Sequence, residues 1–88
     1  MPVSDIDRHL GQRIREARAA KGLSQEELAE QIESLADKVQ AMEEGRVRVS
    51  SLALARISLA LDASLAWFYD GLPGQDIFAS ERGRQRSV

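Results

Sequence analysis

The segment GLSQEELA carries the local signal that most constrains the fold of this chain. Ser24 can accept a hydrogen bond from the backbone N–H of Glu27, whose carboxylate can reach back to the backbone N–H of Ser24. Leu23, just before this capping box, can pack against Leu28 in the first turns of the helix. The segment therefore predicts a helix over residues 25–32 whose entry angle is fixed by its own sequence.

Helical spacing of apolar residues recurs along most of the chain. With serines before the apolar stretches and glycines after them, the spacing predicts helices over residues 6–21, 25–32, 36–44, 52–61 and 65–70. No sustained alternation of apolar and polar residues indicates a strand. The sequence thus predicts an all-α domain, a compact bundle of five helices over residues 1–74, followed by a flexible, loosely structured, Arg-containing tail over residues 75–88.

The apolar stripes of these helices give a candidate core. In the first helix, Ile6, Leu10, Ile14 and Ala17 share one face. In the other helices the inward positions are Leu28, Ala29, Ile32, Val39, Met42, Leu54, Ile57 and Leu61. Because the chain has only four aromatic residues, aliphatic side chains must fill most of the core.

The charge of the chain is unevenly distributed. The 88 residues carry a formal net charge of −2 at pH 7. Three arginines in the last eight residues conceal a more acidic body, since residues 1–80 hold 13 acidic and 9 basic side chains. A protein with this balance can bind nucleic acid only where its basic side chains gather on one face.

Composition argues against several kinds of site. The chain has no cysteine, and its single histidine, His9, cannot build a metal site alone and is expected to be solvated or to cap a helix. No nucleophile–base pair or glycine-rich phosphate loop occurs, which predicts a non-enzyme without a cofactor or an evident small-molecule ligand. No apolar run approaches the roughly 20 residues that span a bilayer, and the first ten residues lack a signal peptide, so we expect a cytoplasmic protein.

Several motifs occur in an order that is typical of one family. LGQRIREAR is followed by KGLSQEELAEQI, by a V-x-x-M-E-x-G block and by SLAWFYDG. Over residues 8–71 the chain therefore resembles the Cro/C1-type, or XRE-like, helix-turn-helix family, which includes the DNA-binding domains of lambdoid phage repressors. The resemblance implies a lambda-repressor-like bundle in which the helices over residues 25–32 and 36–44 form the helix-turn-helix.

The resemblance also assigns roles to residues outside the reading helix. It implies that Arg18 and Glu43 form a partly buried ion pair between the first and third helices. A Glu43 side chain buried without such a partner would be costly. Gln25 falls where the family commonly contacts a DNA phosphate, and Arg46 and Arg48 fall where it grips phosphate or reaches the minor groove.

The helix that should read bases departs from the family pattern. By the resemblance, the reading positions are Ala36, Asp37 and Ala41, and an alanine offers only a methyl contact to thymine. Asp37 can accept a hydrogen bond from cytosine but is repelled by phosphate. The long polar side chains left on this helix are Lys38, which can reach a phosphate, and Gln40, which can project to the side.

The turn between these two helices is also altered. The family usually places glycine, an apolar residue and a polar cap where this chain has Glu33, Ser34 and Leu35. Glycine is favoured because the turn can demand a positive φ. Either the turn survives with Ser34 as the cap of the third helix, or the two helices partly fuse, since the apolar spacing also fits one uninterrupted helix. The flanking motifs favour the surviving turn.

These features lead to two functional hypotheses. The first is a small DNA-binding transcriptional regulator, a repressor that binds double-stranded DNA as a homodimer on a palindromic operator. Its dimer contacts are predicted at the apolar cluster of the last helix, namely Leu65, Trp67, Phe68 and Tyr69. The alternative is a protein-binding module on the same fold, an adaptor, antirepressor or antitoxin with weak or no DNA binding, which the acidic body favours.

Overall fold

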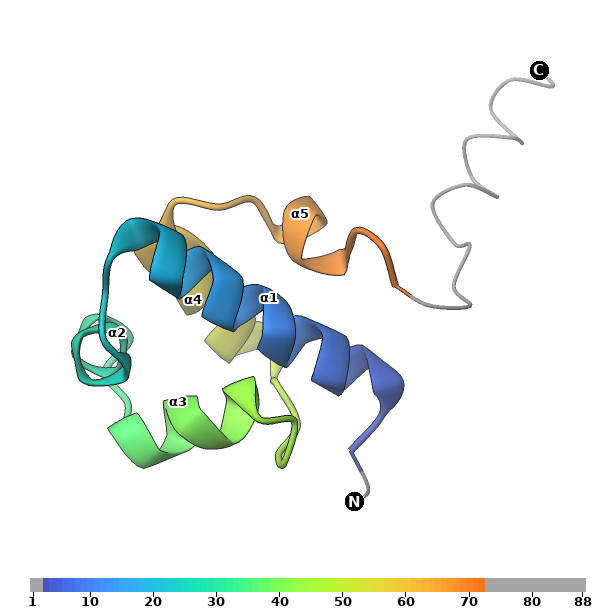
Figure 1. Ribbon diagram of the computed structural model, residues 1–88, viewed down its shortest axis with the longest axis horizontal. Helices are drawn as coiled ribbons and strands as arrows, with labels where there is room; N and C mark the ends of the chain where they lie inside the picture. The colour runs from blue at the N-terminus through green and yellow to red at the C-terminus, as the bar shows by residue number, and fades with distance from the viewer. Residues whose placement is uncertain (1–2, 73–88) are drawn as a thin grey trace, which may run out of the picture.

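The computed structural model describes residues 3–72, and within them the backbone forms five α-helices and no strand. The helices are α1 (Asp5–Lys21), α2 (Gln25–Gln31), α3 (Ala36–Glu43), α4 (Ser51–Leu61) and α5 (Leu65–Tyr69). Figure 1 shows α1 crossing the middle of the domain, with α2 and α3 on one side of it and α5 on the other. The all-α prediction is confirmed. The predicted tail over residues 75–88 lies outside the described residues, and the domain boundary at residue 74 stays a prediction.

Serine side chains cap four of these helices at their N-termini. Each serine Oγ accepts a hydrogen bond from the backbone N–H three residues later, at Ser4, Ser24, Ser50 and Ser64. At α2 the Glu27 carboxylate also accepts from the Ser24 N–H at 2.8 Å, so the capping box predicted from the sequence is confirmed. These caps satisfy N–H groups that have no partner within their own helix.

The core is built from all five helices. Its buried side chains are Leu10, Ile14, Leu28, Ala29, Ile32, Val39, Met42, Leu54, Ile57, Leu61 and Phe68. The predicted stripe is wrong at its first member, because Ile6 is 38% exposed while the neighbouring Asp7 is 6% exposed. The backbone N–H of Val49 binds the Asp7 carboxylate and draws that side chain, rather than Ile6, against the domain.

One glycine sets the spacing between α1 and α3. A Cβ atom at Gly11 would lie 2.1 Å from the carbonyl oxygen of Met42 and 3.2 Å from that of Glu43. No side chain fits in that space, so the two backbones touch at this point. The contact brings the second half of α1 over the C-terminal end of α3, where the functional residues of both helices meet.

The turn between α2 and α3 survives without its usual glycine. Glu33 adopts the left-handed conformation, with φ of 55°, and the backbone N–H of Ser34 donates to the Ala29 carbonyl at 2.8 Å to close α2. The two helices are therefore separate, as favoured above. The expected cap was wrong: Leu35 is the N-cap residue of α3 and provides no side-chain hydrogen bond, because the helix begins one residue later than a Ser34 cap requires.

Relieving the strain at Glu33 should stabilise the domain. Glycine adopts a positive φ without the clash of a Cβ atom, so Glu33→Gly should be more stable than Glu33→Ala by about 0.5–1 kcal/mol. Both variants remove the same charge, and urea unfolding followed by circular dichroism compares them directly. An alanine variant at least as stable as the glycine variant would contradict a strained turn.

Candidate nucleic-acid interface

The predicted ion pair between Arg18 and Glu43 is present and is bidentate. Nε of Arg18 donates to Oε2 of Glu43 at 2.6 Å, and Nη2 donates to Oε1 at 3.0 Å. The side chains are 15% and 2% exposed, so the pair is largely removed from water. Nη1 of Arg18 also donates to the Leu23 carbonyl at 2.8 Å. The pair thus joins the end of α1, the start of α2 and the end of α3.

Gln25, the predicted phosphate contact, belongs to the same cluster. Its Nε2 donates to Oε1 of Glu43 at 3.0 Å, and the side chain is half-buried at the first residue of α2. An amide nitrogen has two N–H donors, so this bond leaves Gln25 capacity for a phosphate oxygen. The Glu43 carboxylate therefore orients Gln25, and its phosphate contact stays a prediction.

The reading helix α3 presents only part of the predicted set to solvent. Asp37, Lys38 and Gln40 are exposed, and Ala36 is half-buried. Ala41 is 8% exposed and belongs to the buried residues of α3, and the backbone N–H of Arg46 donates to its carbonyl oxygen. Ala41 therefore presents little surface to a base, and its contact with a base stays a prediction.

The loop after α3 turns its two arginines outward. Arg46 and Arg48 are exposed, whereas Val47 and Val49 are half-buried and pack against the core. This alternation places both guanidinium groups on the outer side of the loop. Gln40 and Arg46 also share one acceptor, since Gln40 Nε2 and Arg46 Nε donate to the carboxylate of Glu44 at 3.0 and 2.8 Å.

A buried carboxylate at the start of α1 anchors this loop. The Val49 N–H donates to Oδ1 of Asp7 at 3.0 Å, and the backbone N–H and hydroxyl of Ser4 donate to Oδ2 at 3.2 and 2.9 Å. Burial alone would raise the pKa of Asp7, but the hydrogen bonds from Val49 and Ser4, with the nearby charge of Arg48, together hold that pKa below its ordinary value. Asp7 was not among the residues predicted to matter, although the S-x-x-D spacing from Ser4 is that of a capping box.

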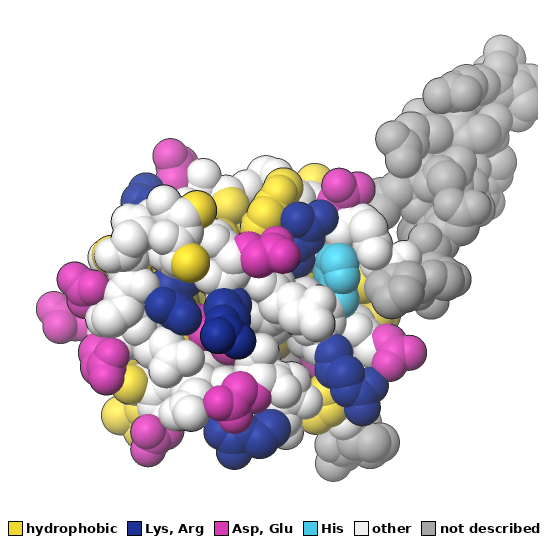
Figure 2. Space-filling model, viewed as in Figure 1, with side chains coloured by type: hydrophobic (Ala, Val, Ile, Leu, Met, Phe, Trp, Pro, Cys, Tyr) yellow, Lys and Arg dark blue, Asp and Glu magenta, His cyan; other side chains and the backbone are white. Residues whose placement is uncertain are grey.

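Charges of both signs cover the molecule. The helix-turn-helix over residues 24–45 contains seven carboxylates and one lysine. Figure 2 shows basic and acidic side chains interspersed over one face instead of separated into a basic and an acidic half. Within the helix-turn-helix and the loop after it, the basic side chains are Lys38 on α3 and Arg46 and Arg48 in the loop, and all three are exposed.

The predicted dimer cluster on α5 divides into core and surface. Phe68 is fully buried in the core of its own domain, which removes it from any contact surface, whereas Leu65 is 46% exposed and Trp67 and Tyr69 are half-buried. Trp67 also carries the guanidinium of Arg13 over its ring, 4.4 Å from the centroid.

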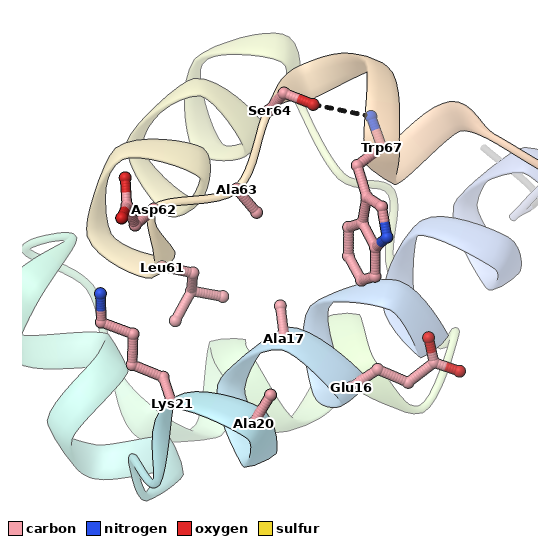
Figure 3. Close-up of a pocket in the computed structure, with 9 residues that line it drawn as sticks. All are labelled: Glu16, Ala17, Ala20, Lys21, Leu61, Asp62, Ala63, Ser64 and Trp67. Atoms are coloured by element: carbon pink, nitrogen blue, oxygen red, sulfur yellow. Dashed lines mark hydrogen bonds between the residues drawn. The ribbon is translucent and has the colours of Figure 1, made fainter.

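An apolar groove lies next to this cluster, between α1 and the start of α5. Its volume is about 690 Å³, and it is lined by Glu16, Ala17, Ala20, Lys21, Leu61, Asp62, Ala63, Ser64 and Trp67. Figure 3 shows the two α1 alanines and Leu61 facing the hollow, with the Trp67 ring standing at one side. The small side chains of α1 therefore leave room beside α5.

His9 has a specific structural partner. Its Nε2 lies 2.8 Å from the carbonyl oxygen of Asp70, the C-cap residue of α5, and Nη2 of Arg13 donates to the same oxygen at 3.0 Å. His9 therefore caps α5 from α1. Among residues 3–72, no group of three or more potential ligands could hold a metal ion. No helix in that part of the chain is long and apolar enough to cross a membrane.

Comparison with known proteins places this geometry in a family. The model of the helix-turn-helix domain family matches residues 9–66. An HTH-type transcriptional regulator of Rickettsia prowazekii is 39% identical over 70 residues, which cover 80% of this chain and 54% of that protein. The chain belongs to the helix-turn-helix family of transcriptional regulators, which are not enzymes, and it spans about half the length of that relative.

Solved structures agree with this assignment. The clp gene regulator ClgR of Corynebacterium glutamicum has a TM-score of 0.75 at 32% identity, covering 98% of this chain and 93% of its own. The restriction-modification controller protein C.AhdI of Aeromonas hydrophila has a TM-score of 0.68 at 36% identity, covering 72% of this chain and 96% of its own. The resemblance to the Cro/C1-type family is confirmed.

The buried ion pair should contribute far more to stability than an exposed arginine on the same helix. Arg18→Ala leaves Glu43 buried without its main partner, and we expect a loss of about 2–4 kcal/mol. Arg15→Ala, at an exposed position of α1, should cost less than about 0.5 kcal/mol. Thermal unfolding by circular dichroism measures both, and equal melting temperatures would refute a structural role for the pair.

Proposed function

We propose that this protein regulates transcription by binding a palindromic operator as a homodimer. The observation that carries the proposal is the loop after α3, where Arg46 and Arg48 face outward beside an intact helix-turn-helix. Asp7 fixes the backbone of that loop at Val49. An anchored pair of arginines next to a reading helix suits the phosphate contacts that position such a domain on duplex DNA.

Most of the proposed DNA affinity comes from phosphate contacts. Gln25, Lys38, Arg46 and Arg48 supply these contacts, and counterion release makes them dependent on salt. Direct reading of bases falls to the exposed Asp37 and Gln40 and to the half-buried Ala36 of α3. With so few hydrogen-bonding groups there, much of the choice of site comes from the shape and deformability of the DNA.

Dimerisation completes the proposed binding unit. Two copies paired about a two-fold axis through α5 would bury the exposed part of Leu65 with Trp67 and Tyr69, and the adjoining groove offers further apolar surface. A small domain buries a modest fraction of its surface, so pairing also adds stability. Two-fold symmetry in the protein calls for two-fold symmetry in the operator.

Repression in the cytoplasm follows most simply from this arrangement. A dimer that occupies an operator excludes other proteins from the same stretch of DNA. We place the protein in the cytoplasm because a bacterial chromosome lies there and the relative named above is a transcriptional regulator of a bacterium.

The acidic helix-turn-helix keeps one alternative open. Seven carboxylates and one lysine over residues 24–45 suit a protein partner with a basic surface better than they suit phosphate. A protein-binding module of this kind would show little or no DNA affinity even at low salt, whereas a phosphate-gripping dimer loses affinity steeply as salt rises.

Removal of one loop arginine should weaken DNA binding on every sequence. Arg46→Ala and Arg48→Ala should each lower affinity at 50 mM salt and reduce the slope of log K against log salt by about 1 per bound protomer. Lys21→Ala removes the same charge beside the groove and should have little effect. Fluorescence anisotropy with a selected duplex and a random duplex measures these changes. Absence of binding by the unchanged protein at micromolar concentration and 50 mM salt would refute DNA binding.

A charge on α5 should separate the dimer. Leu65→Asp should convert a sedimenting dimer to a monomer, because it places a carboxylate in the proposed interface. Leu59→Asp provides a matched control, since Leu59 is 84% exposed on α4 and lies outside the α5 cluster. Analytical ultracentrifugation distinguishes the species. A monomeric unchanged protein, or dissociation by the control alone, would contradict pairing through α5.

A further inference from the structure

One carboxylate holds two of the side chains proposed to contact DNA. Glu44 is the C-cap residue of α3, and its backbone N–H donates to the Gln40 carbonyl at 3.0 Å. Its Oε2 accepts from Nε2 of Gln40 at 3.0 Å, and its Oε1 accepts from Nε of Arg46 at 2.8 Å. The sequence places these residues at i−4 and i+2 of Glu44, so a single side chain can reach both.

The chemistry of this cluster resembles that of a phosphate contact. A guanidinium binds carboxylate and phosphate oxygens through the same N–H groups, so Glu44 occupies part of the edge that a DNA phosphate would use. Hydrogen bonds from Gln40 and then Arg46, with a further contribution from the charge of Arg15, hold the pKa of Glu44 below its ordinary value. The carboxylate is therefore ionised at neutral pH and acts as a competing anion.

The cluster is also placed where it can open. The side chains of Arg46 and Glu44 are 60% and 45% exposed, and ion pairs at such positions contribute little net free energy because water competes for both charges. An arriving phosphate therefore meets no large barrier in separating them. The buried pair of Arg18 and Glu43, one residue away in sequence, contrasts with it and stays closed.

We propose that Glu44 competes with DNA phosphate for Arg46 and so sets the affinity of this protein for DNA. Phosphate displaces the carboxylate from Arg46, and the same displacement frees the amide of Gln40 to turn toward a base edge. The phosphate contact of Arg46 and the base contact of Gln40 are thereby coupled through Glu44. The inference rests on the DNA-binding function proposed above. In it, Glu44 is a positioning residue that weakens the binding of the protein to DNA of random sequence.

Neutralising Glu44 should strengthen DNA binding. Glu44→Gln and Glu44→Ala should tighten binding to a random 20-base-pair duplex about three- to tenfold at 50 mM salt. The gain should appear mainly in affinity and little in the salt slope, because Arg46 contacts the same phosphate in the bound complex of both proteins. Glu30→Gln removes the same charge at an exposed position of α2 and should change affinity by less than about twofold.

A second variant separates competition from a general change of charge. In an Arg46→Ala background, Glu44→Gln should give no more gain than Glu30→Gln, because the group for which it competes is gone. Thermal unfolding of each variant confirms that the fold is kept, as the exposure of Glu44 predicts. A full gain in the Arg46→Ala background, or equal effects of Glu44→Gln and Glu30→Gln, would overturn the inference alone. Absence of DNA binding by every variant at 50 mM salt would overturn the proposed function and the inference with it.

Discussion

The buried ion pair of Arg18 and Glu43 ties the first three helices of the domain together. Its hydrogen bonds, with those to Leu23 and Gln25, join α1, α2 and α3 at one point. The contact at Gly11 brings the α1 and α3 backbones together, so the pair closes across an already short distance. The Glu43 carboxylate is 2% exposed and would be costly to bury without these partners. Its bonds therefore hold the C-terminal end of α3 against α1.

The parts of the interface follow from that arrangement. Because α3 is fixed at its C-terminal end, the loop after it leaves in a defined direction, and Asp7 holds the loop again at Val49. Charge is distributed between two clusters of different burial. The inner cluster is closed and structural, whereas the outer cluster at Glu44 is exposed and can exchange its carboxylate for another anion. The altered turn at Glu33 leaves the helix-turn-helix intact. Because the side chains of α3 are short, the arginines of the loop after it are the main basic groups of the proposed DNA-binding surface.

Features that depend on nearby residues were predictable from the sequence. The capping box of Ser24 and Glu27, the caps at Ser50 and Ser64 and the stripes of α2 to α4 are local patterns, and the family resemblance supplied the partner of Arg18. Features that depend on packing between distant segments were not predictable. The burial of Phe68 and Ala41, the close approach at Gly11 and the anchor from Asp7 to Val49 arise only when the helices meet. Leu35, without a side-chain hydrogen bond, occupies the N-cap position of α3 where Ser34 was expected.

A titration of isotope-labelled protein with duplex DNA, followed by NMR at low salt, would locate the DNA-binding surface on the protein. We expect the largest chemical-shift changes in three stretches: the start of α2 at Gln25, the exposed residues of α3, and residues 45–50. The outer surface of α4, around Leu59, should change little. Large changes confined to α4 and α5, or no changes at all, would contradict a DNA-binding surface built on the helix-turn-helix and its arginine loop.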